Sequence, residues 1–172
     1  MNEYGNQVIE WRRYFHQYPE LSLQEVETTK RIAAELDKLG IPYEINTEKN
    51  TGLVATIQGG KPGKTITLRA DIDALPVTEL TDADFKSKNP GCMHACGHDA
   101  HMSVLLGAAK ILQQVKDDLH GKVYLLFQPS EEDGEGSPYM RRFGTWYEES
   151  DAIFGGHIWI DLPAGKINIE EG

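Results

Sequence analysis

The stretch Val123-Tyr124-Leu125-Leu126-Phe127 is followed directly by Gln128-Pro129-Ser130-Glu131-Glu132. Five consecutive apolar residues are typical of a short strand that is buried on both faces, as the central strands of α/β sheets are. The change to polar residues after Phe127 marks the carboxyl end of that strand. Because open α/β sheets bind ligands at the carboxyl ends of their strands, we look for a functional site around Glu131 and Glu132.

Helices and strands alternate along the rest of the chain. The expected elements are helices at 5–18, 22–39 and 99–115 and strands at 52–57, 65–70, 123–127 and 152–160. Ser22 and Glu25 resemble a capping box that opens the second helix. A glycine-rich turn joins the first two strands, which we expect to form a hairpin or to lie close together. The alternation predicts an α/β fold, a layered sheet with flanking helices.

The composition narrows the class of protein. The chain has 172 residues, 40% of them apolar, and a formal net charge of −10, which suits one domain with a real core. The acidic balance argues against nucleic acid or an anionic membrane as a partner. No apolar run approaches the ~20 residues of a membrane span, and residues 1–4 lack the features of a secretory signal. We therefore expect a cytoplasmic protein.

Cys96 and His98 are separated by a glycine, so both side chains can turn toward one point. A thiolate and an imidazole are both good zinc ligands. The alternative is a buried free cysteine beside a histidine that caps the following helix. His94 and His101 lie close by in the sequence, and with them the two interpretations are about equally strong.

Other ionisable residues follow the remaining predicted strands. Asp71 and Asp73 are two residues apart and face the same side of a strand, so they are candidate ligands or partners that orient a ligand. His157 interrupts the last apolar run. In an extended segment Glu131 and Glu132 point to opposite sides, so one can bind metal while the other reaches water. Each feature also has a purely structural interpretation, respectively a terminal turn, a core histidine and a solvated acidic loop.

These segments also resemble a known family. The chain is similar to the amidohydrolase branch of the zinc aminoacylase/carboxypeptidase metallopeptidase family, which includes hippurate hydrolases, N-acyl-L-amino-acid amidohydrolases and hydrolases of indole-acetyl amino acids. The matching stretches span nearly the whole chain and are Arg12–Ser22, Arg69–Pro76, Met93–His101, Phe127–Glu132 and Gly156–Trp159. The resemblance implies a partial zinc-exopeptidase-like catalytic domain.

The resemblance also implies roles for individual residues. The positions that correspond to metal ligands are Cys96, His98, Glu132 and His157. Cys96 matches the bridging ligand of a two-metal site, a position filled by aspartate in other branches. Glu131 corresponds to the catalytic base, and Asp73 to a residue that orients a ligand. The implied cofactors are two divalent ions, for which a thiolate favours zinc while carboxylates also admit manganese or cobalt.

The implied reaction is metal-dependent hydrolysis of the amide bond of a small N-acyl amino acid. The ions polarise the carbonyl and lower the pKa of a shared water from ~15.7 toward ~7, and Glu131 transfers the proton of that water to the leaving nitrogen. The products are a carboxylic acid and a free amino acid.

Length separates this chain from the family. Residues 1–172 correspond to the N-terminal part of the catalytic domain, so a lid or dimerisation domain and a C-terminal return segment with a last histidine ligand are expected to be absent. Apolar edges left open favour association, including a homodimer. The alternative function is an inactive metal-binding remnant or association module of that family. A redox role for Cys92 and Cys96 is disfavoured because their spacing is not that of a Cys-x-x-Cys motif.

Overall fold

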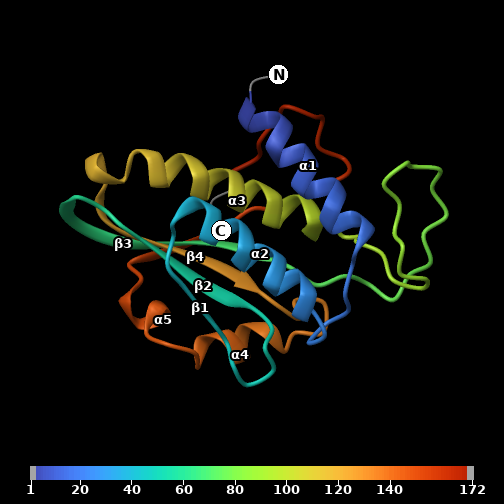
Figure 1. Cartoon of the computed structure of the whole chain (residues 1–172), viewed down its shortest axis with the longest axis horizontal. Coiled ribbons are helices and arrows are strands. Elements are labelled where there is room, and N and C mark those ends of the chain that lie inside the picture. The colour runs from blue at the N-terminus through green and yellow to red at the C-terminus, as the bar shows by residue number, and fades with distance from the viewer. Residues whose placement is uncertain (1–2, 170–172) are drawn as a thin grey trace.

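Helices cover both faces of one mixed sheet, as Figure 1 shows. The computed structural model describes residues 3–169. Its helices are α1 (Glu3–Gln17), α2 (Val26–Leu39), α3 (His98–Gln114), the 3-10 turn η1 (Lys116–Asp118), α4 (Gly136–Arg141) and α5 (Trp146–Glu149). Its strands are β1 (Tyr43–Ile45), β2 (Leu53–Gln58), β3 (Lys61–Asp71), β4 (His120–Gln128) and β5 (Ala152–Gly155). The predicted α/β class, a layered sheet with flanking helices, is confirmed.

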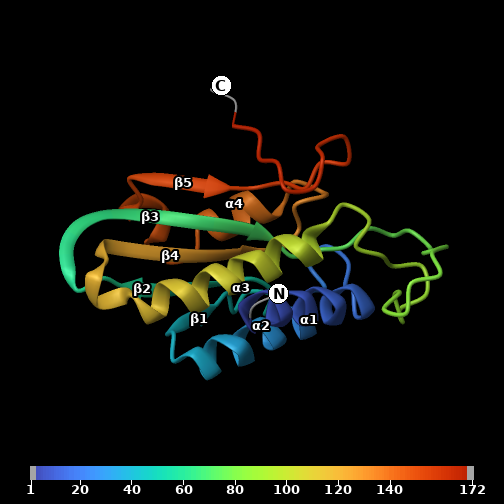
Figure 2. The same ribbon diagram turned by 90° about the horizontal axis from the view of Figure 1, so that it is seen from above.

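The apolar run at 123–127 forms the central strand of the sheet. The strand order is β1-β2-β4-β3-β5, which Figure 2 shows from above. Val123, Leu125 and Phe127 pack into the core beneath α1, α2 and α3. Tyr124 and Leu126 pack on the opposite face, in a cluster with residues of the α4–α5 region. Alternate residues of a strand point to opposite faces, so a strand covered on both sides needs an unbroken apolar run.

The expected hairpin between residues 52–57 and 65–70 is wrong. β4 lies between β2 and β3, pairing antiparallel with β2 and parallel with β3. β2 and β3 therefore both pair with β4 and not with each other, because the strand that is apolar on both faces takes the central place. The backbone of β3 near Lys64 passes very close to the backbone at the start of β4. Gly121 has a φ of 82°, and a Cβ there would overlap the carbonyl oxygen of Lys64.

Two further boundaries differ from the sequence-based prediction. The second helix begins at Val26 rather than near 22, and the expected capping box does not form, since Glu25 at its N-cap makes no side-chain capping bond. Ser22 instead donates its hydroxyl to the carboxylate of Asp73 at 2.8 Å. β1, of only three residues with Glu44 exposed and its two neighbours half-buried, was not expected from the sequence.

The last strand is shorter and more exposed than predicted. β5 ends at Gly155 instead of 160, and Phe154 is 58% exposed rather than buried. His157 therefore lies after the strand, in a segment without regular structure, and not inside it. β5 pairs only with β3 among the described strands, so it forms an edge of the sheet. Within residues 3–169 no helix is both long and apolar enough to cross a bilayer.

Candidate metal centre

Three parallel strands bring their carboxyl ends to one edge of the sheet. β3 pairs in parallel with both β4 and β5, with Asp71 opposite Gln128 and Arg69 opposite Gly155. The segments that follow these strands carry the predicted site residues, and α3 begins at the same edge. The topology thus explains why residues from four separated segments meet there, as expected for open α/β sheets.

His98 lies at the centre of the cluster, with its side chain fully buried. Its Nδ1 is 2.8 Å from the main-chain carbonyl of Asp73, which can only accept, so Nδ1 carries the proton and donates. Its Nε2 has no hydrogen-bond partner in the described part of the chain. That nitrogen lies 3.7 Å from a carboxylate oxygen of Glu131 and 3.7 Å from one of Glu132. A buried polar atom without a partner is costly, and an unprotonated ring nitrogen is a potential metal ligand.

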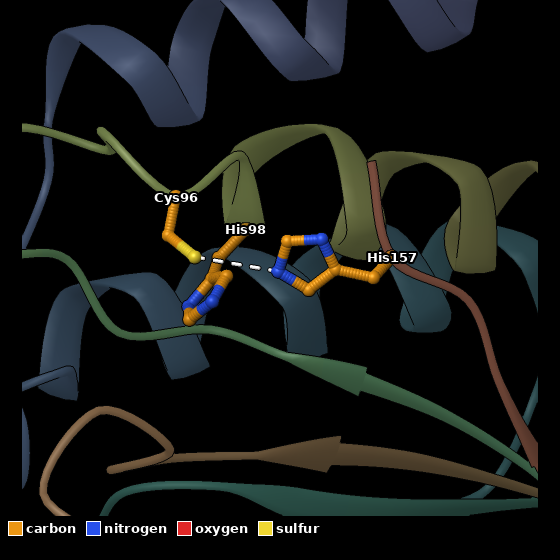
Figure 3. A group of neighbouring side chains, drawn as sticks. All are labelled: Cys96, His98 and His157. Atoms are coloured by element: carbon orange, nitrogen blue, oxygen red, sulfur yellow. Dashed lines mark hydrogen bonds between the residues drawn. The ribbon is translucent and has the colours of Figure 1, made fainter. Parts of the chain in front are cut away.

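Cys96 and His157 complete the group from two other segments. Figure 3 shows the sulfur of Cys96 and the ring of His157 turned toward one another beside His98. Cys96 Sγ lies 3.3 Å from His157 Nε2. Nδ1 of His157 bonds the carbonyl of Ile158, which leaves Nε2 as the nitrogen that faces the sulfur. The potential ligand atoms of Cys96, His98 and His157 all lie within 4.8 Å of one another.

The glycine between the first two candidate ligands has the conformation that this arrangement needs. Gly97 precedes α3 with a φ of 90°, in the left-handed region that favours glycine. The chain reverses its direction there, so Cys96 and His98 both turn toward one point, as the sequence predicts.

Glu131 and Glu132 lie on the same side of the chain, which differs from the alternation expected of an extended segment. Ser130 has a φ of 55°, an uncommon value for a residue with a side chain. The chain turns there and no longer follows the two-residue period of a strand. Both carboxylates consequently lie 3.7 Å from Nε2 of His98, and the two glutamates form a potential metal-binding group with that histidine.

The electrostatics of the cluster favour a bound cation. Burial, together with the neighbouring Glu132 and Glu131 carboxylates, raises the pKa of the Cys96 thiol to about 11. Burial opposes the charged form of His98, yet its hydrogen bond to Asp73 and the charge of Asp71 raise its pKa overall. Several carboxylates thus surround one buried imidazole and one thiol. A divalent ion compensates such negative charge, and a sulfur, nitrogen and oxygen donor set suits zinc. The residues present therefore fit a metal.

Asp73 is held as a carboxylate beside this cluster. Its pKa falls to about 2, because the hydrogen bonds from His98 and from the main chain of Glu132 outweigh the effect of burial. Its side chain is fully buried. Asp73 thus contacts His98 and the Glu132 segment without facing the free Nε2 atom.

Two histidines near the cluster have other surroundings. His94 is buried and neither ring nitrogen has a partner among the described residues. Burial lowers its pKa to about 4, so it is neutral at physiological pH. His101 bonds the carboxylate of Asp71 through one nitrogen and the main chain of Ile158 through the other. Sequence reasoning noted only that these histidines are close by, since a bond to a main-chain N–H has no signature in the sequence.

Ion pairs from the segment Arg12–Ser22 hold the start of α3 in place. Arg12 Nε and His16 Nδ1 each lie 2.8 Å from the same oxygen of Asp99. Asp99 follows His98 directly and is almost fully buried. This ion-pair network explains why a stretch of α1 belongs with the site although it contributes no candidate ligand.

Comparisons with known proteins agree with the fold and assign its family. Residues 67–172 match the model of peptidase family M20/M25/M40. The whole chain aligns with 44% of the length of thermostable carboxypeptidase 1 of Saccharolobus solfataricus, at 46% sequence identity. It also aligns with 46% of the length of the N-acyl-L-amino acid amidohydrolase of Geobacillus stearothermophilus, at 41% identity. The crystal structure of the Bacillus subtilis YXEP protein, described as a dinuclear metal-binding peptidase from the M20 family, superposes on 98% of this chain with a TM-score of 0.94 and 43% identity. The match covers 47% of that structure, so this chain spans less than half the length of these relatives.

Proposed function

Because the chain belongs to peptidase family M20/M25/M40, we propose that the intact protein hydrolyses the amide bond of N-acyl amino acids with the aid of two divalent metal ions. The unpartnered Nε2 atom of His98 carries this proposal. It lies beside Cys96, His157, Glu131 and Glu132 at the carboxyl edge of the sheet. A buried nitrogen without a partner calls for an explanation, and a bound ion among these potential ligands provides one.

Cys96, His98, Glu132 and His157 would hold the metal ions, with Cys96 as the ligand shared between them. The YXEP protein is described as dinuclear, which supports two ions rather than one. When bound, the ions would polarise the scissile carbonyl and acidify a water molecule. Zinc fits the thiolate best, while the carboxylates also suit manganese or cobalt.

Glu131 would act as the general base. Its carboxylate is 39% exposed and lies within 3.7 Å of His98 Nε2, so it reaches both the cluster and solvent. It would take a proton from the attacking water and deliver it to the leaving nitrogen. Asp73 would orient His98 through its carbonyl oxygen and the Glu132 segment through its carboxylate.

The substrate class rests on the relatives. Proteins that match the whole chain include a carboxypeptidase and an N-acyl-L-amino acid amidohydrolase. Both names describe cleavage of an amide bond next to an amino acid. We infer that a small N-acyl amino acid is the substrate of the intact protein, with a free amino acid as one product.

The test uses the intact protein that contains this sequence, with Glu131→Gln and the matched Glu135→Gln in the same loop, where Glu135 is exposed. N-acetyl amino acids and hippurate are assayed after loading with zinc, manganese or cobalt. We expect Glu131→Gln to lower kcat by roughly 10²–10⁴-fold, while its metal content and the activity of Glu135→Gln stay unchanged. Full activity of Glu131→Gln would refute the assigned base. Metal binding by the wild type without any turnover would favour the alternative of a metal-binding remnant.

A further inference from the structure

His101 lies on the first turns of α3 between two of the proposed ligands. Its ring centroid is 5.5 Å from that of His98 and 4.8 Å from that of His157. Asp71, His98 and His101 also form a group whose potential ligand atoms are close enough together to hold a metal ion. The side chain is only 4% exposed. A buried histidine in this place could be either a further ligand or a support for the ligands.

The hydrogen bonds of His101 decide between these two roles. The main-chain N–H of Ile158 donates to Nε2 of His101 at 2.9 Å. A nitrogen that accepts carries no proton, so the single proton of the neutral ring is on Nδ1. Nδ1 lies 2.6 Å from Oδ1 of Asp71 and donates to it. Both ring nitrogens are therefore engaged, and neither is free to bind a metal.

The acceptor of that proton is itself fixed by the sheet. Arg69 Nη1 donates to the other oxygen of Asp71 at 2.8 Å, and Arg69 Nε donates to Gln128 at 3.0 Å. These three residues end β3 and β4. A continuous chain of hydrogen bonds thus runs from the two central strands through Asp71 and His101 to the main chain of Ile158.

The hydrogen bond from Ile158 to His101 restrains a segment that has no regular structure of its own. Residues 156–159 have no regular structure and are exposed. His157 is the proposed ligand in this segment, and Ile158 follows it directly. A hydrogen bond from the N–H of Ile158 restrains the backbone that carries the His157 ring. Nε2 of that ring lies 3.3 Å from Sγ of Cys96.

We propose that His101 is a positioning residue that holds His157 in place for metal binding by accepting the main-chain N–H of Ile158 in its Nδ1–H tautomer. This inference rests on the proposed function, because it takes His157 as a metal ligand. Hydrogen-bonded partners that orient metal ligands typically contribute 10- to 100-fold to metal affinity or activity, and we expect an effect of roughly that size here.

Two substitutions separate the hydrogen bond to Ile158 from the bond to Asp71. In His101→Asn the amide can still reach Asp71 but is too short to reach Ile158. In His101→Gln the longer side chain can present its oxygen to the N–H of Ile158. His120→Asn, at an exposed histidine that begins β4, is the matched control.

The readout is the dissociation constant for cobalt and zinc in the intact protein, measured by competition with a chelating dye, alongside kcat at saturating metal. We expect His101→Asn to bind metal roughly 10- to 100-fold more weakly than the wild type. His101→Gln should recover most of that loss, His120→Asn should show none, and saturating metal should restore most of the kcat of His101→Asn. Equal losses in the Asn and Gln variants, or wild-type affinity in His101→Asn, would overturn the proposal.

A second measurement does not depend on whether the variants fold. In wild-type protein labelled with ¹⁵N-histidine, two-bond nitrogen–proton correlations identify the tautomer of each ring. The proposal requires the Nδ1–H form for His101, and an Nε2–H form or a doubly protonated ring would refute it. A wild type that binds metal but hydrolyses none of the amides contradicts only the proposed function. A wild type that binds no metal contradicts both.

Discussion

The carboxylate of Asp73 accepts the main-chain N–H of Glu132 at 3.0 Å. The same oxygen accepts the hydroxyl of Ser22, and the main-chain carbonyl of Asp73 accepts Nδ1–H of His98. Asp73, which follows β3, therefore fixes both the start of α3 and the loop that follows β4. The mutual placement of His98 and Glu132 depends on it.

Replacing Asp73 with asparagine should disturb that placement. The other carboxylate oxygen lies 3.3 Å from Nδ1 of His98, so an amide NH₂ at this position would face an N–H donor. We expect metal affinity to fall by roughly 10- to 100-fold, as measured by chelator competition. Asp82→Asn, in an exposed loop, is the control. Unchanged affinity in Asp73→Asn would show that the residue does not orient the ligands.

Glu25 should make stability depend on pH. Its side chain is fully buried, one oxygen accepts the N–H of Ser130 at 2.8 Å, and the other has no partner in the described part of the chain. Burial raises its pKa from 4.5 to about 7. Between these two values the folded state retains a proton that the unfolded state has lost, so stability decreases as the pH rises from about 4.5 to 7.

The substitution Glu25→Gln removes this titration and can keep the acceptor for Ser130. Relative to wild type, the variant should gain up to roughly 3 kcal/mol in the free energy of unfolding on going from about pH 4 to about pH 8. Chemical unfolding of the metal-free protein at several pH values measures the difference. Glu44→Gln, at an exposed position, should show no such trend. A difference between Glu25→Gln and wild type that does not change with pH would contradict the prediction.

Metal binding should release a proton from Cys96. With a pKa of about 11, raised by burial and by the nearby carboxylates, this thiol is protonated at neutral pH in the metal-free protein. A cysteine binds metal as the thiolate, so binding displaces the proton. Calorimetric titration of zinc in buffers of different ionisation enthalpy counts the protons released. We expect Cys96→Ser to release about one fewer than the wild type.

The second cysteine supplies the control for that experiment. Cys92 is buried, is not among the candidate ligands and is not disulfide-bonded to Cys96. Cys92→Ser should release as many protons as the wild type. Equal release by Cys96→Ser and wild type would exclude Cys96 as a metal ligand.

Gly136→Ala should destabilise the turn that carries the two glutamates. The N–H of Gly136 donates to the carbonyl of Ser130 at 2.9 Å, and a Cβ at this position would overlap the carbonyl oxygen of Pro129. We expect a loss of roughly 1–3 kcal/mol in the free energy of unfolding, with a lower melting temperature. Gly156→Ala, where a Cβ meets nothing within 4 Å, is the control. Equal stability of the two variants would contradict the prediction.

The fold was predictable where burial imposes a pattern on the sequence. The apolar run at 123–127 indicated the central strand, because both of its faces are covered. The placement of β2 and β3 on either side of β4 was not predictable, since residues 52–57 and 65–70 satisfy the pattern of a hairpin equally well. The length of β5 was overestimated because its apolar residues are exposed at an edge in this chain.

The sequence predicted which side chains gather in the candidate site but not the residues that support them. Cys96, His98 and the two glutamates belong to short motifs whose side-chain chemistry points to metal binding. The contact between His101 and Ile158 uses a main-chain N–H, which every residue except proline possesses. Glu25 looked like part of a capping box, yet its partner Ser22 bonds Asp73 instead.

Cys96 and His157 are 61 positions apart in the chain, and they approach each other only when β5 has paired with β3. Such distant parallel pairings close large loops and form slowly. The cluster therefore depends on the tertiary fold, and a short peptide from either segment alone would not reproduce it. An ion that binds only the assembled donors stabilises the native state by mass action, by about 4 kcal/mol at a thousandfold excess over its dissociation constant. A metal bound by these residues would thus raise the free energy of unfolding in addition to its part in the proposed hydrolysis.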